Sequence, residues 1–166
     1  KNTDKYYIPF TFTRKHGIIR KKEVKPVNRK AKVIISVLAL IAAIAAYPVN
    51  MPLMADGTPG ALSLLVSASF VLLSAAYLYV NKGSKRLITA SVIYWAVLLL
   101  SAGIVILSCV TDSTPAVMII FAMATLPPVF GIPVAFGAVS VLYLIVTGLI
   151  PLLFLVFSLI LGKKRK

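Results

Sequence analysis

The sequence predicts an all-α integral membrane protein with four transmembrane helices and a basic N-terminal arm. A re-entrant or interfacial segment, broken by proline and glycine, is expected between the third and fourth helices. Of the 166 residues, 60% are hydrophobic and only 13% are charged, and the mean hydropathy is +0.97. A soluble domain carries about 25% charged residues and lacks apolar runs of about 20 residues. The composition therefore excludes a soluble globular enzyme and a disordered basic protein.

The second observation is the distribution of charge. The chain has 18 Lys and Arg residues against four Asp and Glu residues, and the basic residues fall into three blocks, before residue 33, at 82–86 and at 163–166. Because cytoplasmic loops of membrane proteins carry the excess of Lys and Arg, we expect both termini and the 82–86 loop to face the cytoplasm. The cell membrane is the favoured location. Asp56 and Asp112 lie in the loops expected on the other side.

Residues 1–32 are predicted to form a basic cytoplasmic arm. Eleven basic residues against Asp4 and Glu23 give it a net charge of +9. Residues 6–13 alternate aromatic and polar side chains, which is typical of a short strand or an extended arm. We expect the arm and the basic loop to bind a neighbouring subunit or anionic lipid rather than nucleic acid, since no nucleic-acid-binding motif accompanies the charges. The candidate residues for this binding are Tyr6, Tyr7, Phe10, Phe12, Arg14, Lys15, Arg20, Lys21, Lys22, Lys82, Lys85 and Arg86.

The first three spans follow from the uncharged stretches between the basic blocks. They are predicted at about 33–54, 61–80 and 87–110. The first begins after Lys30 and Lys32, and Pro48, Pro52 and Gly57 are expected to loosen its end. A turn rich in Pro and Gly at 55–60 leads to the second span, and a basic turn around residue 83 leads to the third.

From residue 116 to residue 162 the sequence has 47 residues without a charge. One straight helix of that length would be about 70 Å long, more than twice the ~30 Å hydrocarbon core. Three prolines and two glycines between Pro127 and Gly137 must break the helix. A cytoplasmic tail at 163–166 requires an odd number of crossings, and only one fits. We therefore predict that 116–136 does not cross and that the fourth span covers 137–161; the alternative is five spans with an external C-terminus.

Two further patterns concern packing. Apolar backbone that does not cross the membrane is tolerated only where protein covers it, so segment 116–136 suggests that the chain packs inside something larger. Small and hydroxyl-bearing residues also recur at helix-packing spacings, which indicates packing within one bundle, contact with another subunit, or a small-molecule groove. The candidate packing residues are Ala39, Ala43, Ser67, Ser101, Gly103, Ser140, Tyr143 and Thr147.

The chemistry that the spans lack is informative. No Asp, Glu, Lys, Arg or His lies within any predicted span, the single His is His16 in the arm, and the single Cys is Cys109. Proton relays, pumps and voltage sensors need ionisable groups inside the membrane, and a haem held within one chain needs axial ligands in its helices. We therefore expect no catalytic residues, no metal site and no cofactor of the chain's own.

These observations favour a non-catalytic accessory subunit of a larger membrane complex, such as an energy-converting or oxidase-type assembly. It would scaffold the helices of other integral subunits and hold partners or anionic lipid with its arm. The alternative is a small transporter, a channel component or a holin-like pore-forming protein, for which only scattered hydroxyl groups are available. A third hypothesis is a membrane enzyme that uses Tyr or Ser with a cofactor bound by other chains.

Overall fold

The computed structural model describes residues 28–56, 60–111, 115–137 and 140–163, and these contain helices and no strand. The helices are α1 (Arg29–Asp56), α2 (Ala61–Asn81), α3 (Lys85–Val110), α4 (Ala116–Thr125), α5 (Pro127–Val134) and α6 (Val141–Lys163). Four of them, α1, α2, α3 and α6, are long and apolar enough to cross a membrane. The prediction of an all-helical chain with four such helices and a broken segment is confirmed. Residues 1–27 of the predicted arm lie outside the described residues, and its residues 29–32 form the start of α1.

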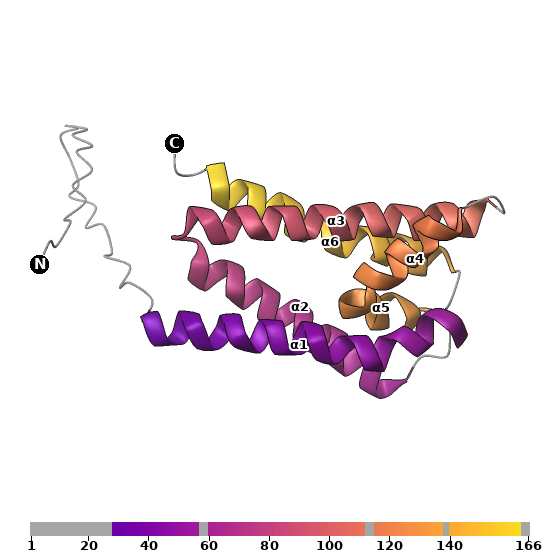
Figure 1. Ribbon diagram of the computed structural model, residues 1–166, viewed down its shortest axis with the longest axis horizontal. Coiled ribbons are helices and arrows are strands. Elements are labelled where there is room, and N and C mark those ends of the chain that lie inside the picture. Colours follow the sequence, from indigo (N-terminus) through magenta and orange to yellow (C-terminus); the bar gives the residue numbers. More distant parts are fainter. Residues whose placement is uncertain (1–27, 57–59, 112–114, 138–139, 164–166) are drawn as a thin grey trace, which may run out of the picture.

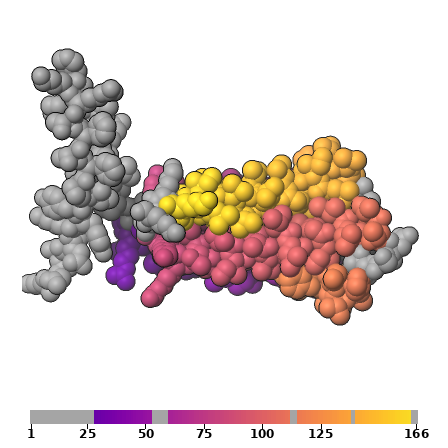
Figure 2. All heavy atoms as spheres, turned by 90° about the horizontal axis from the view of Figure 1, so that it is seen from above, coloured from indigo at the N-terminus to yellow at the C-terminus, as the bar shows by residue number. Residues whose placement is uncertain are grey.

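The long helices form two pairs, α1 with α2 and α3 with α6 (Figure 1). In the space-filling view α6 lies alongside α3 (Figure 2). Helix α5 packs against α1, α2 and α6, and α4 packs against α3. One end of the bundle holds the start of α1, the turn between α2 and α3, and the end of α6 (Figure 1). We call this the basic end, because it holds all the Lys and Arg residues that the structure describes: Arg29, Lys30, Lys32, Lys82, Lys85, Arg86 and Lys163.

The opposite end, the break end, contains a sharp bend. Helices α4 and α5 meet at Leu126 with an angle of 93° between them. Helix α5 is buried along most of its length, whereas Ala122 is the buried residue of α4. The expectation that another protein must cover this segment is wrong for α5, because the chain's own α1, α2 and α6 cover it.

Helix α1 is longer than the sequence predicted. It continues through Pro48 and Pro52 to Asp56, although each proline removes one backbone hydrogen bond. Asn50, between the two prolines, bonds to Ser67 of α2 and to the Pro127 carbonyl of α5, so tertiary contacts hold a stretch that local propensity does not favour. Helices α2 and α3 differ from the predicted spans by one or two residues, and α6 begins at Val141 rather than Gly137.

Candidate functional site

A cluster of aromatic rings joins the two helix pairs at mid-length. Trp95 of α3 stacks on Phe154 of α6 with 4.3 Å between ring centroids. Phe70 of α2 contacts Trp95 at 6.1 Å and Tyr94 at 6.3 Å. Trp95 is only 2% exposed. These rings bring α2, α3 and α6 together but leave space between them and the basic end.

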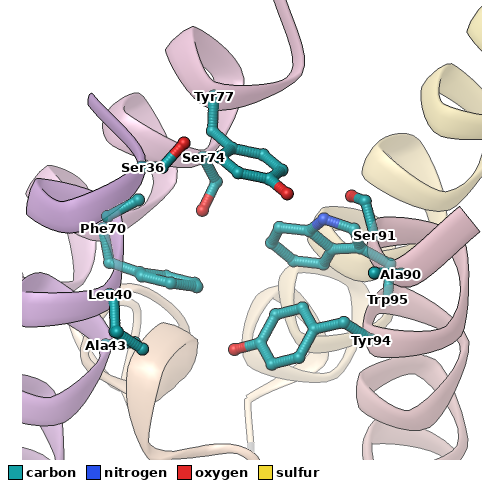
Figure 3. Close-up of a pocket in the computed structure, with 11 residues that line it drawn as sticks. Ser36, Leu40, Ala43, Phe70, Ser74, Tyr77, Ala90, Ser91, Tyr94 and Trp95 are labelled. Atoms are coloured by element: carbon teal, nitrogen blue, oxygen red, sulfur yellow. The ribbon is translucent and has the colours of Figure 1, made fainter. Parts of the chain in front are cut away.

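That space is a cavity of about 320 Å³ between α1, α2 and α3, which we call the interhelix cavity (Figure 3). Its walls combine aromatic rings, alanine methyl groups and hydroxyl groups. A concave site with mostly apolar walls and a few polar groups is the usual form of a small-molecule site. The lining residues are Ser36, Ala39, Leu40, Ala43, Phe70, Ser74, Tyr77, Ala90, Ser91, Tyr94 and Trp95.

The hydroxyl groups of the interhelix cavity fall into two classes. Ser36 Oγ accepts a hydrogen bond from Asn81 Nδ2 at 3.2 Å, and Ser91 Oγ lies 3.3 Å from Ser158 Oγ. In contrast, the hydroxyl groups of Ser74, Tyr77 and Tyr94 have no hydrogen-bond partner among the residues that the structure describes. Their side chains extend into the space between the two helix pairs (Figure 3). Since an unpaired hydroxyl in apolar surroundings costs free energy, these three groups suit water or the polar part of a ligand.

A second cavity of about 430 Å³ adjoins the first. The two share Ala90 and Tyr94 in their walls. The second cavity extends to Tyr47 of α1 and Thr125 of α4. Two adjacent cavities therefore lie between α1 and α3, from the level of Ser36 and Ala90 to that of Tyr47 and Thr125.

At the break, side chains of α1 bind backbone carbonyl groups of the bent pair. Pro128 has no N–H to bond to the carbonyl of Ala124, four residues earlier. The hydroxyl of Tyr47 donates to that carbonyl at 2.6 Å. Asn50 Nδ2 donates to the carbonyl oxygen of Pro127, also at 2.6 Å. The first bond satisfies a carbonyl that a proline leaves without a backbone donor, and the second joins α1 to the start of α5.

Ser67 of α2 completes this network. Its Oγ accepts from Asn50 Nδ2 at 2.8 Å and from the backbone N–H of Gly131 at 3.1 Å. Gly131 is required because α5 touches α2 directly: a Cβ atom there would overlap the carbonyl of Ser63 and lie 2.8 Å from Ser67 Oγ. Asn50 is fully buried, and its Oδ1 has no partner among the described residues. A separate hydrogen bond near the break joins α3 to α4: Ser101 Oγ lies 2.6 Å from Thr125 Oγ1.

The structure places the predicted packing residues in different roles. Ala39 and Ala43 line the interhelix cavity, and Ser67 and Ser101 bond to neighbouring helices. Gly103 is exposed, and a Cβ atom there would meet nothing within 4 Å.

The remaining packing residues lie in or just before α6. Ser140 accepts a hydrogen bond from the backbone N–H of Tyr143 at 3.0 Å. The ring of Tyr143 lies edge-on to Phe130 at 6.0 Å, and Thr147 donates to the carbonyl of Tyr143 in its own helix at 2.7 Å. Lys82, Lys85 and Arg86 are exposed at the basic end. The arm residues proposed to bind partners lie outside the described part of the chain.

Sequence reasoning missed Tyr47 and Asn50. A signal for Asn50 was present, because an amide between two prolines in an apolar span needs a hydrogen-bond partner.

In comparisons with known proteins, the chain matches no protein-family model, no curated protein and no solved structure.

Proposed function

We propose that this chain is a non-catalytic accessory subunit of a larger membrane complex, with an energy-converting or oxidase-type assembly favoured, and that it acts through contacts. The proposal rests on the polar groups of the bundle: charged residues are nearly absent from it, and several polar side chains are bonded between helices. Between residues 33 and 162, charged residues occur only at Asp56, at 82–86 and at Asp112. Asn50, Ser67 and Ser101 are engaged in bonds between helices.

The bent pair α4–α5 supports a topology of four crossings. Its two helices have ten and eight residues. Even end to end and straight they would extend about 27 Å, and the bend shortens this well below the ~30 Å hydrocarbon core. The pair is therefore a re-entrant or interfacial element in this proposal, and both termini are cytoplasmic.

Charge supports the docking role. The basic end carries its Lys and Arg residues on three separate helices and the turn between α2 and α3, and residues 1–28, before α1, add a net charge of +6. Such a surface attracts anionic lipid headgroups at about 1 kcal/mol per basic residue and an acidic face of a partner equally well. In the proposal the arm binds a neighbouring subunit, and the exposed apolar faces of the helices pack against its membrane part.

The test is the composition of the particle that the chain forms in its own membrane. The full-length chain, tagged at the C-terminus, is extracted in a mild detergent, sized, and weighed by native mass spectrometry. Other integral membrane proteins in a fixed ratio to the chain are the expected result. A particle that contains copies of this chain alone would contradict the subunit role.

One observation favours the second candidate, a small transporter or channel component. A broken helix beside a cavity between two helix pairs is the arrangement in which many transporters bind their substrates, and here α5 lies between such pairs. Purified chain in sealed vesicles would then support ion or solute flux. Under the subunit proposal these vesicles stay as tight as empty ones.

A further inference from the structure

The space between α1 and α3 has the depth of one bilayer leaflet. The adjoining cavities extend along α1 from Ser36 to Tyr47, eleven residues and so about 16 Å of helix. Half of the hydrocarbon core measures about 15 Å. Walls rich in Leu, Ala and aromatic side chains suit an acyl chain that enters from the leaflet at the basic end.

Two of the three free hydroxyl groups, those of Ser74 and Tyr77, lie where such a lipid becomes polar. Tyr77 and Ser74 precede the end of α2 at Asn81 by four and seven residues, which places them about 6 Å and 10 Å along the helix axis from that end. The ester groups of a glycerophospholipid lie just below its phosphate. Ester carbonyl oxygens accept hydrogen bonds, and the hydroxyls of Ser74 and Tyr77 are free to donate them.

Charge selects the headgroup. All described basic residues lie at this end of the bundle, and the described residues there include no Asp or Glu. A phosphate at this level would meet only positive charge, which disfavours a headgroup that carries a compensating ammonium group. A neutral hydrophobic molecule would form no charge interaction with the basic side chains.

We infer that the interhelix cavity binds an anionic glycerophospholipid. One acyl chain lies between α1 and α3 and reaches the ring of Trp95. The ester region accepts hydrogen bonds from Ser74 and Tyr77, and the phosphate lies among the side chains of the basic end. This inference does not rest on the accessory-subunit proposal.

The chain provides its own reporter for this site. Trp95 is its single tryptophan, lines the cavity, and is only 2% exposed. Bromine atoms on a lipid acyl chain quench tryptophan fluorescence at contact. Lipids around the outside of the bundle cannot contact a ring that Phe154 and Phe70 cover, so quenching reports occupation of the cavity.

The experiment uses the full-length chain in phosphatidylcholine vesicles that contain a minor fraction of phosphatidylglycerol. In one sample the phosphatidylglycerol carries dibrominated chains, and in the other an equal amount of phosphatidylcholine carries them. We expect quenching of Trp95 to saturate at about fivefold lower content of the brominated anionic lipid, the ratio that one basic contact with a headgroup supplies. Equal quenching by the two lipids, or no quenching by either, would overturn the inference.

Matched variants separate the cavity from the rest of the bundle. Ala39→Leu fills the cavity and should abolish the preferential quenching, whereas Ala45→Leu, on an exposed part of α1, should leave it unchanged. Ser74→Ala combined with Tyr77→Phe should weaken it, and Tyr79→Phe, outside the cavity, should not. Circular dichroism confirms the helical fold of each variant. Preferential quenching that survives both Ala39→Leu and the loss of the two hydroxyls would also overturn the inference.

Discussion

The two ends of the bundle use several of their polar side chains in different ways. At the break end, Tyr47, Asn50 and Ser67 all bond to the backbone around the bend between α4 and α5. At the basic end, the hydroxyls of Ser74 and Tyr77 face a cavity without a partner among the described residues. Polar side chains of similar type are thus structural in one place and free to bind in the other.

The prolines account for one of these bonds, that of Tyr47 to the Ala124 carbonyl, which Pro128 leaves without a backbone donor. Pro127, Pro128 and Pro133 remove backbone donors at the break, and each carbonyl left free in an apolar environment must find another donor. Helices α2 and α3 contain no proline, so the backbone near the basic end makes no such demand. Where the helix backbone makes all its own hydrogen bonds, a hydroxyl that faces a cavity is not needed by the backbone and is free to bind a ligand.

The largest expected effect is at Gly131. Gly131→Ala places a methyl group against the backbone of Ser63, which cannot move away easily. We expect a loss of about 3 kcal/mol in the free energy of unfolding, measured by thermal or denaturant unfolding in detergent micelles. Gly103→Ala is the control: no atom lies near the added methyl group, so stability should be unchanged or rise by up to about 1 kcal/mol. Equal effects of the two variants would contradict the close contact between α5 and α2.

Asn50 should rank second. Asn50→Ala removes the donor to the Pro127 carbonyl and to Ser67 Oγ, and so removes two buried hydrogen bonds. We expect a cost of about 2 kcal/mol in the free energy of unfolding. Ser67→Ala should cost less in the Asn50→Ala background than alone, because the two residues share a hydrogen bond. Ser108, which bonds only within its own helix, provides the control Ser108→Ala; additive effects at 50 and 67 would argue against the network.

Substitution of Tyr47 should have a smaller effect on the free energy of unfolding. Tyr47→Phe removes the bond to the Ala124 carbonyl and should cost about 1 kcal/mol. Pro128→Ala restores a backbone N–H to that carbonyl, so Tyr47→Phe should cost nothing further in the Pro128→Ala background. Tyr79→Phe, at an exposed position, is the matched control. An unchanged cost of Tyr47→Phe in both backgrounds would show that the proline is not the reason for the bond.

The smallest effect on folding is expected at the basic end. Deletion of residues 1–25 removes much of the arm's charge but none of the described helices. The free energy of unfolding of the bundle should change by less than about 0.5 kcal/mol. Assembly with partner proteins, followed by co-purification at increasing salt, should weaken. A bundle that unfolds without the arm would show that the basic charge serves folding.

The sequence was sufficient to predict the helices and the position of the break. Charged blocks mark the ends of the apolar stretches, and Pro127, Pro128 and Pro133 leave no continuous helix between 116 and 136. The predicted first span already continued past Pro48 and Pro52 to about 54, but its end was expected to be loosened; the structure has α-helix to Asp56 there, where contacts with α5 oppose the low propensity of proline.

The contacts at the break and the cavity could not be predicted from the sequence. Tyr47 bonds to Ala124, and Asn50 to Pro127, across 77 residues of sequence. The cavity depends on how far α1 lies from α3, and hydrophobic periodicity does not report a distance between helices. The serines of α2 share one apolar face in the sequence, but only the structure separates Ser67, which is bonded to α5, from Ser74, which is free.

In the topology that we propose, α4 and α5 turn the chain back without crossing the membrane. Single-cysteine variants in a Cys109→Ser background, one at Ser113 and one at Lys166, are exposed to a membrane-impermeant maleimide in intact cells and after permeabilisation. We expect labelling at Ser113 in intact cells, and labelling at Lys166 only after permeabilisation. Labelling of Lys166 from outside intact cells would mean that α4–α5 crosses the membrane and that the proposed topology is wrong.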